Sequence, residues 1–261
     1  NDWYAFLAER KLDEVNFWRP SPGPYFTNLQ AGTPFLFKLK APFNHIAGGG
    51  VFAQYSTLPI EMVWDAFGEK NGAASFREFD QKIRAYRKLP KGPLEMGSNV
   101  LVEPFFFPRD QWISLPDWPR AVVQGKTYDT ETTEGAWIWN EVQQRLQDKA
   151  IMDLVAEPAV EYGGPRYGEQ FLTRSRLGQG AFRVLVSEAY GKRCAITGES
   201  TLPVLEAAHI KPYELEGPHK ITNGMLLRSD FHKLFDAGLV TVTPELRVRV
   251  SDRIREQYFN G

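Results

Sequence analysis

The sequence has a single cysteine, Cys194, in 261 residues. One thiol forms no internal disulfide and is too few for a multi-cysteine zinc ribbon, so both kinds of cross-linked fold are excluded. This cysteine usage fits a reducing compartment. We therefore expect a cytoplasmic protein in which Cys194 is a small buried hydrophobic residue.

Long apolar runs and a strong charge of one sign are also missing. No segment approaches the ~20 apolar residues that cross a bilayer, so we expect no membrane partner. The net charge of −1 argues against a protein that coats nucleic acid. Basic side chains do outnumber acidic ones in residues 166–261, which is compatible with phosphate contacts there.

The first 130 residues are rich in aromatic side chains, proline and glycine, with short apolar runs between turn signals. Alternating or apolar runs predict strands, and periodic apolar positions predict helices. The expected strands cover 35–40, 46–55 (with a bend at its glycines) and 100–107, and the expected helices cover 61–67 and 76–88. Mixed short elements of this kind predict a compact α+β domain, built as a β-barrel.

Residues 131–168 are predicted to be a helix, over 133–154, followed by a Gly/Pro-bearing linker. A second domain is expected over 169–261. Its predicted elements are a helix at 180–190, a strand at 194–198 that enters a turn, a strand at 204–209, a turn opening at 223–226, a helix at 229–235, and a hairpin of 239–243 with 247–250. Its core order is therefore strand, strand, helix.

Three of the four histidines lie in this second domain, and an asparagine stands between two of them, His209 and His232. Hydrolysis of a phosphodiester needs a base that deprotonates water and a divalent cation that stabilises the developing charge. His209 ends a predicted strand and could direct a ring nitrogen at water, while the Asn223 amide could bridge two loops. His232 and Asp236 are four residues apart on a predicted helix, about 5–6 Å from each other, which suits one metal ion.

These residues lie in separated blocks, at 182–183, 189–198, 206–212 and 223–239, whose order resembles the HNH endonuclease family. The resemblance implies a ββα-metal fold and hydrolysis of double-stranded DNA. It also implies His209 as general base, Asn223 as the residue that holds the histidine loop, and His232 as a metal ligand. Asp236 takes the position where related enzymes carry a second ligand on the helix.

The chain departs from that family at Ala208, since many relatives place a ligand immediately before the base. The ion would then depend on water and phosphate oxygens, which suits Mg²⁺ or Mn²⁺, with Zn²⁺ or Ni²⁺ as substitutes in crystals. Arg176 and Arg228 are candidate phosphate contacts. His219 is expected in a surface loop. Because one HNH site cuts one strand, we expect a homodimer at least on DNA.

The first domain has a looser resemblance, carried by residues 16–20, 35–40 and 46–52, to PUA-like barrels that include EVE-type and SRA-type readers of modified bases. That resemblance implies a pocket that holds a flipped modified cytosine between aromatic rings. Candidates for the pocket are Trp18, Tyr25, Tyr55, Trp112 and Trp118 for stacking, and Asn16 or Asn99 for hydrogen bonds to the base.

Three functions stay open on the sequence. The favoured one is a modification-dependent restriction endonuclease with an N-terminal reader and a C-terminal nuclease. The second is an HNH endonuclease of ordinary sequence specificity. The third is a DNA-binding protein whose nuclease core is inactive because Ala208 leaves the metal weakly held.

Overall fold

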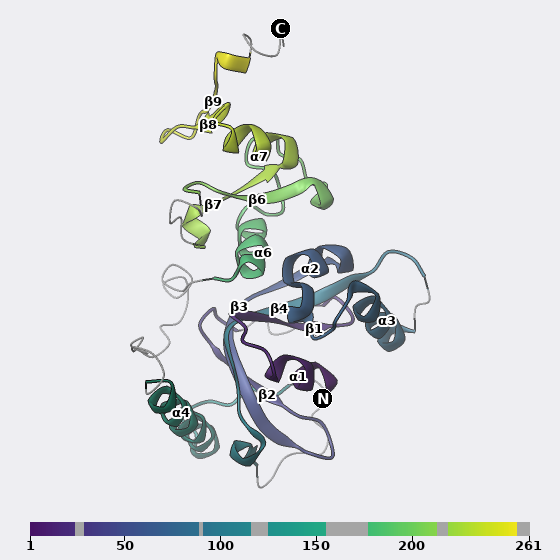
Figure 1. The fold of residues 1–261 in the computed structure, drawn as a ribbon, viewed down its shortest axis with the longest axis vertical. Coiled ribbons are helices and arrows are strands. Elements are labelled where there is room, and N and C mark those ends of the chain that lie inside the picture. The colour runs from purple at the N-terminus through teal and green to yellow at the C-terminus, as the bar shows by residue number, and fades with distance from the viewer. Residues whose placement is uncertain (24–28, 89–90, 116–124, 155–176, 213–218, 255–261) are drawn as a thin grey trace.

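The structure, a computed structural model, describes residues 1–23, 29–88, 91–115, 125–154, 177–212 and 219–254. Its N-terminal part is built around one antiparallel sheet (Figure 1). The strands of that sheet are β1 (Glu14–Arg19), β2 (Pro34–Lys38), β3 (His45–Pro59), β4 (Glu95–Phe106) and β5 (Ile113–Ser114). The helices around it are α1 (Asp2–Ala8), α2 (Ile60–Phe67), α3 (Phe76–Arg87) and α4 (Thr133–Leu154), and the short 3₁₀ helices are η1 (Gly68–Asn71) and η2 (Arg109–Gln111).

The sheet is open, so the predicted barrel is wrong. Its strand order is β1-β4-β3-β2, with β5 paired to the start of β3. Closure would require β1 to pair with β2, and within the described ranges each of these strands pairs on one side only. The bend expected at the glycines of β3 is confirmed by shifts in register after Gly49 and Phe52. Gly48 is required there, because a Cβ would lie 2.3 Å from the Phe105 carbonyl oxygen.

Both faces of the sheet are covered by helices. On one face, α2 and α3 contribute Ile60, Phe79 and Ile83 to the largest apolar cluster. On the other face α1, which the sequence did not reveal, buries Leu7 against Val15 of β1. The predicted helix 76–88 is confirmed as α3. The apolar side chains near its two ends are exposed to solvent, so only the middle of its apolar face is buried.

The C-terminal part contains a second, smaller set of elements. They are α6 (Gln179–Ala189), η3 (Leu202–Val204), β6 (Leu205–His209), η5 (Ile221–Asn223), β7 (Gly224–Arg228), α7 (Ser229–Asp236), β8 (Val240–Val242) and β9 (Val248–Val250). β6 and β7 form an antiparallel pair, and β8 and β9 form the expected hairpin.

Two local predictions in this part are wrong: of the two strands expected before the helix 229–235, only 204–209 is found, as β6, and the strand paired with it is β7. Residues 194–198 form a turn rather than a strand. The buried Cys194 sulfur accepts backbone hydrogen bonds from Thr197 and Arg228, and these bonds hold the turn. In the segment 223–226, expected to open a turn, Asn223 ends η5 and the next three residues lie in strand β7 because they pair with β6.

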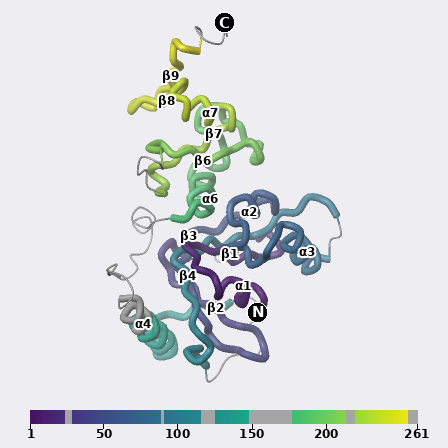
Figure 2. The backbone as a smooth tube through the Cα atoms, in the orientation of Figure 1, coloured from purple at the N-terminus to yellow at the C-terminus, as the bar shows by residue number. Residues whose placement is uncertain are grey.

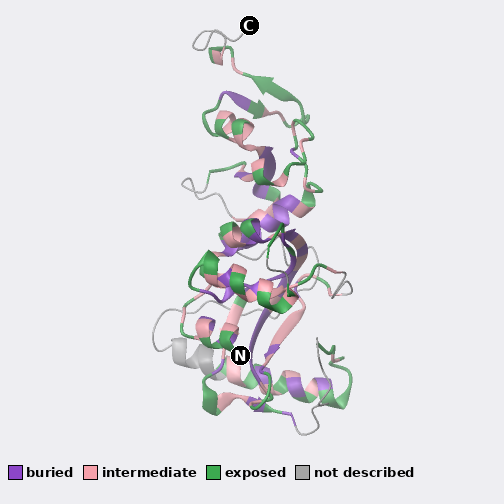
Figure 3. Cartoon of the chain, turned by 90° about the vertical axis from the view of Figure 1, so that its right-hand side faces the viewer, coloured by how far each residue is buried: buried purple, intermediate pink, exposed green. Residues whose placement is uncertain are grey.

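The helix α6 lies between the N-terminal sheet and the β6–β7 pair (Figure 2). One apolar cluster runs from α2 and β4 through α6 to β6 and β7. Buried positions accordingly occur in both the lower and the upper part of the molecule (Figure 3). The two parts therefore share a core, and the elements around β6 are supported by the N-terminal sheet.

Candidate active site

His209 is the last residue of β6 and lies opposite Gly224 of β7. Its imidazole is stacked on the buried Phe182 ring of α6, with ring centroids 4.1 Å apart and planes 10° from parallel. Gly224 permits this packing, because a Cβ at that position would lie 2.2 Å from Val186 Cγ2 and 3.1 Å from the Phe182 ring. The orientation of the imidazole is therefore set by contact with α6.

Asn223 holds the chain that leaves His209. Its side-chain Oδ1 accepts a hydrogen bond from the Lys211 amide at 2.8 Å, and its Nδ2 donates to the Lys211 carbonyl at 3.0 Å. The Ile210 amide donates to the Asn223 carbonyl at 2.8 Å. The buried amide thus bridges two loops, the geometry expected from the sequence.

The surroundings of His209 favour its neutral form. Burial lowers its pKa from the ordinary value of 6.5, positive charge on His219 and His232 lowers it further, and Asp236 partly opposes the shift. At neutral pH the imidazole is therefore uncharged and able to accept a proton. The charges of His232 and Asp236, on α7, are thus near enough to act on the pKa of His209.

His219 was expected in a surface loop, and it does lie in a loop, but its side chain is not simply exposed. Its ring is half-buried, with its centroid 4.9 Å from that of His209 and 5.5 Å from that of Phe182. The contact arises because the carbonyl of His219 accepts a hydrogen bond from Leu177, just ahead of α6. Sequence spacing does not indicate the contact between His219 and Phe182, because the two residues lie in separate elements far apart along the chain.

His232, on α7, lies between two carboxylates. Its Nδ1 is 2.6 Å from Glu206 Oε2, and its Nε2 is 3.3 Å from Asp236 Oδ2. A proton on Nδ1 can be donated to Glu206, and an Nε2 without a proton would then offer its lone pair to a metal ion beside Asp236. Two electron-rich atoms that face each other are stabilised by a cation between them.

The His232 and Asp236 atoms fit a small divalent cation. Adjacent ligand atoms of an octahedral Mg²⁺ site, each ~2.1 Å from the ion, are about 3 Å apart. The 3.3 Å between Nε2 and Oδ2 is close to that spacing. No group of three or more His, Cys, Asp or Glu side chains suited to a metal occurs in the described residues. Ala208 is fully buried and offers no side-chain ligand, so water and phosphate oxygens would complete the shell.

Glu206 is the site residue that the sequence reasoning missed. It lies in the same short strand as His209, three residues before it, and its neighbours in that strand are mostly apolar. A carboxylate in an otherwise apolar strand beside the candidate base was the feature of the sequence that could have identified Glu206 as a site residue. Its partner could not be identified from spacing, because Glu206 and His232 are 26 residues apart.

Arg228 lies at the exposed edge of this site and is paired with Asp230. Its Nε and Nη2 donate to the two carboxylate oxygens at 2.7 Å each, and this pairing lowers the pKa of Asp230 to about 2. A phosphate would therefore compete with Asp230 for this guanidinium. Arg176, the other candidate phosphate contact, lies outside the described residues.

Among the aromatic candidates that the structure describes, Trp18 and Tyr55 do not line one pocket. Trp18 and Tyr55 align with neighbouring positions of β4, Ser98 and Asn99 respectively. Successive strand residues face opposite sides of a sheet, so the two rings lie on opposite faces and belong to different apolar clusters. One base cannot stack between them.

The remaining candidates are also separate. Asn16 is fully buried, and its amide donates to Asn71 Oδ1 at 2.8 Å. The Asn99 amide donates to the Phe17 carbonyl. Both asparagine side chains therefore form hydrogen bonds inside the N-terminal domain rather than at a base-binding surface. Trp112 packs edge-on against Tyr4, in a third place. Tyr25 and Trp118 lie outside the described residues.

Residues 194–243 match the model of a protein family described as HNH endonuclease. The C-terminal part therefore contains an HNH endonuclease domain. The matched range spans His209, Asn223, His232 and Asp236, and the resemblance to that family is confirmed for the blocks at 206–212 and 223–239 and for the end of the block at 189–198. Such a domain indicates hydrolysis of phosphodiester bonds in nucleic acid, generally with a divalent metal.

The comparisons are silent on the first domain. No curated protein matches the chain. Nothing supports the resemblance of the N-terminal residues to PUA-like barrels. Across the ranges that the structure describes, every helix is too short or too polar to cross a membrane.

Proposed function

We propose that this protein is a metal-dependent DNA endonuclease in which His209 is the general base and His232 and Asp236 bind one divalent cation. The observations that carry the proposal are the neutral His209 imidazole held against Phe182 and the His232–Asp236 pair of metal-ligand spacing, with all three polar residues inside the HNH endonuclease match. The expected ion is Mg²⁺ or Mn²⁺, because only two protein ligands are offered and both ions accept water and phosphate oxygen as the rest.

In this mechanism each side chain has a separate task. His209 takes a proton from a water molecule as that water attacks phosphorus, so that one P–O bond forms while the other breaks. Phe182 keeps the imidazole plane in place, and Asn223 holds the loop behind it. Glu206 keeps the His232 proton on Nδ1, which leaves Nε2 for the ion. The bound cation would stabilise negative charge on the phosphate and the leaving oxygen.

The test is cleavage of supercoiled plasmid with Mg²⁺ or Mn²⁺, followed on gels, with EDTA as the metal-free control. His209→Ala should abolish nicking and leave DNA binding intact, and Asp236→Ala should raise the metal concentration needed. His45→Ala is the matched control, since His45 lies at the start of β3 in the N-terminal sheet. Undiminished cleavage by His209→Ala would mean that another group is the base.

The finer hypothesis is that the first 130 residues direct cleavage to DNA with modified cytosine, as in a modification-dependent restriction enzyme. The aromatic-rich composition of that domain supports the hypothesis. The positions of Trp18, Tyr55 and Trp112 do not, because the three rings belong to different apolar clusters. Plasmids that carry methylated, hydroxymethylated or plain cytosine decide the matter. Equal cleavage of all three would favour an HNH endonuclease of ordinary specificity.

Two further outcomes of these assays are informative. Retained DNA binding without cleavage under any divalent ion would favour the third hypothesis, a DNA-binding protein with an inactive core. A double-strand break needs two copies of a site that cuts one strand, so we propose a homodimer on DNA. Sedimentation of the protein–DNA complex as a monomer would contradict that assembly.

A further inference from the structure

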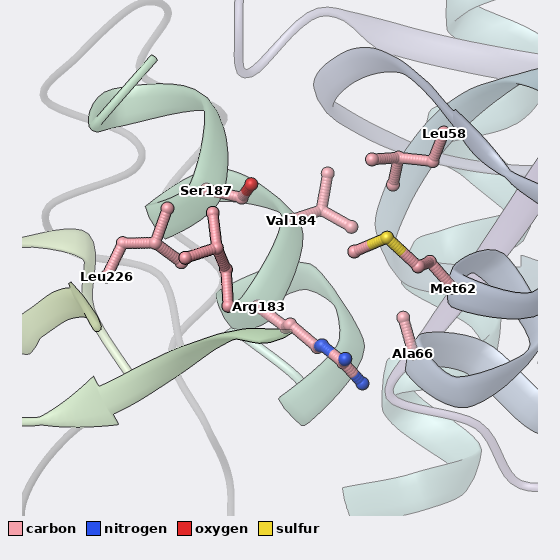
Figure 4. A pocket seen from close by; sticks show the side chains of 8 residues that line it. Leu58, Met62, Ala66, Arg183, Val184, Ser187 and Leu226 are labelled. Carbon is pink, nitrogen blue, oxygen red and sulfur yellow. The ribbon is translucent and has the colours of Figure 1, made fainter. Parts of the chain in front are cut away.

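Helix α6 has two occupied faces. Toward the nuclease site it presents Phe182, under His209, and Val186, against Gly224. Its opposite face, with Val184 and Ser187, meets the N-terminal residues Leu58, Met62 and Ala66 across a small apolar pocket (Figure 4). The helix that supports the base therefore also packs against the other half of the molecule.

The first turn of α6 is anchored by Glu14, a residue of β1. Its carboxylate is fully buried and accepts hydrogen bonds from the Gly180 amide at 2.9 Å and the Ala181 amide at 2.7 Å. These are backbone groups that a helix leaves without partners at its start, where a negative charge is also favoured. Lys70 neutralises the same carboxylate, with Nζ 2.7 Å from Oε1. Gly178 makes room for it, since a Cβ there would lie 2.3 Å from Glu14 Cδ.

The other end of α6 is also tied to the N-terminal sheet. The Ser56 hydroxyl of β3 donates to the Glu188 carboxylate. Lys192, just after the helix, donates to the Thr57 carbonyl at 2.9 Å and pairs with Glu188 at 3.1 Å. With both ends held, the axial position of α6 is determined by β1 and β3.

We infer that Glu14 is a positioning residue for the His209 base, acting through the first turn of α6 and the Phe182 ring. Ala181, whose amide Glu14 binds, immediately precedes Phe182, and that ring lies 4.1 Å from the imidazole. The N-terminal part thus completes the nuclease site from the far side of the core. This inference rests on the proposed function, in which His209 takes the proton.

Glu14→Gln tests the inference with little change of volume. It removes the charge and leaves one carbonyl oxygen in place of two acceptors. A displaced base lowers kcat steeply, so we expect a loss of about tenfold or more. The Mn²⁺ concentration at half-maximal activity should stay unchanged, because His232 and Asp236 lie on α7. DNA affinity without metal should also stay unchanged.

A spectroscopic readout separates positioning from general destabilisation. The His209 ring protons lie over the Phe182 face and should carry an upfield ring-current shift in ¹H–¹³C NMR spectra. Glu14→Gln should alter that shift, and Phe182→Leu should remove it. Because both changes act through one contact, their effects on kcat should not add in the double variant.

Val142→Ala is the matched control. Val142 is fully buried on α4, in a cluster separate from the one that contains α6, so its truncation should cost stability without moving the base. Wild-type kcat and His209 shifts in Glu14→Gln, or equal changes in Val142→Ala, would overturn the inference. If Glu14→Gln does not fold, Lys70→Gln perturbs the same carboxylate, and unchanged His209 shifts in that variant are equally decisive.

The two proposals fail in different ways. If the wild-type protein cuts no nucleic acid with any divalent ion, the proposed function fails. In that case the NMR comparison still tests whether Glu14 positions the His209 ring. A His209 shift that responds to Glu14→Gln supports the positioning role, and one that does not refutes it.

Discussion

Replacing Glu206 with alanine should weaken metal binding at His232 and Asp236. In the wild type the Glu206 carboxylate, 2.6 Å from His232 Nδ1, keeps the proton on that nitrogen and leaves Nε2 for the ion. A hydrogen bond to a charged group contributes ~1.5–3 kcal/mol, and the 44% exposure of the Glu206 side chain favours the lower end. Since 1.4 kcal/mol is a factor of ten, we expect about tenfold weaker affinity.

The assay is calorimetric titration of the protein with Mn²⁺, together with the Mn²⁺ dependence of plasmid nicking. Glu206→Gln keeps an acceptor for the Nδ1 proton, although the hydrogen bond is then neutral and weaker. Converting that smaller loss of free energy in the same way gives an expected loss of Mn²⁺ affinity of only about threefold. Glu245→Ala is the charge-matched control, in the loop between β8 and β9. Wild-type affinity in Glu206→Ala would refute the reasoning. A loss far beyond about a hundredfold would instead place Glu206 in contact with the ion.

Three further predictions concern the surroundings of the base. Because the pKa of His209 is lowered below 6.5, a pH–rate profile should show a constant kcat above pH 6.5 and a fall in kcat as the pH drops through the lower folded-state pKa. The contribution of this group to protein stability should likewise be complete above pH 6.5. It should decline below that pH, because the unfolded chain binds the proton more tightly than the folded protein does. Gly224→Ala should destabilise the protein by about 1–3 kcal/mol in urea unfolding, because the new methyl group overlaps Val186, and an unchanged midpoint would contradict the packing. Asp230→Ala frees the Arg228 guanidinium and should raise DNA affinity several-fold, with a steeper salt dependence in anisotropy titrations; equal affinity at every salt concentration would exclude Arg228 as a phosphate contact.

Local patterns in the sequence identified the elements whose stability depends on near neighbours. The helix predicted over 133–154 is found with those bounds as α4, and the hairpin around Pro244 is found as β8 and β9. His232 and Asp236 meet because residues four apart share a helix face, which needs no knowledge of the rest of the chain. The separated HNH blocks likewise kept their order, so the nuclease domain was recognisable before its fold was known.

Predictions failed where a distant partner decides the conformation. Residues 224–226 became part of a strand because β6 offers a pairing edge, and residues 194–198 became a turn closed on the Cys194 sulfur. Trp18 and Tyr55 cannot share one base-binding pocket, because the register places them on opposite faces of one sheet. Composition alone carries no information about register.

The sequence by itself determined which residues make up the proposed nuclease site, since the HNH blocks that contain His209, Asn223, His232 and Asp236 are recognisable from residue type and order. Only the tertiary structure decided what surrounds them. Glu206 faces His232, and Glu14 anchors the helix beneath His209, through contacts between segments 26 and 167 residues apart. Such pairs form only when a shared core brings their elements together, so no short-range pattern records them.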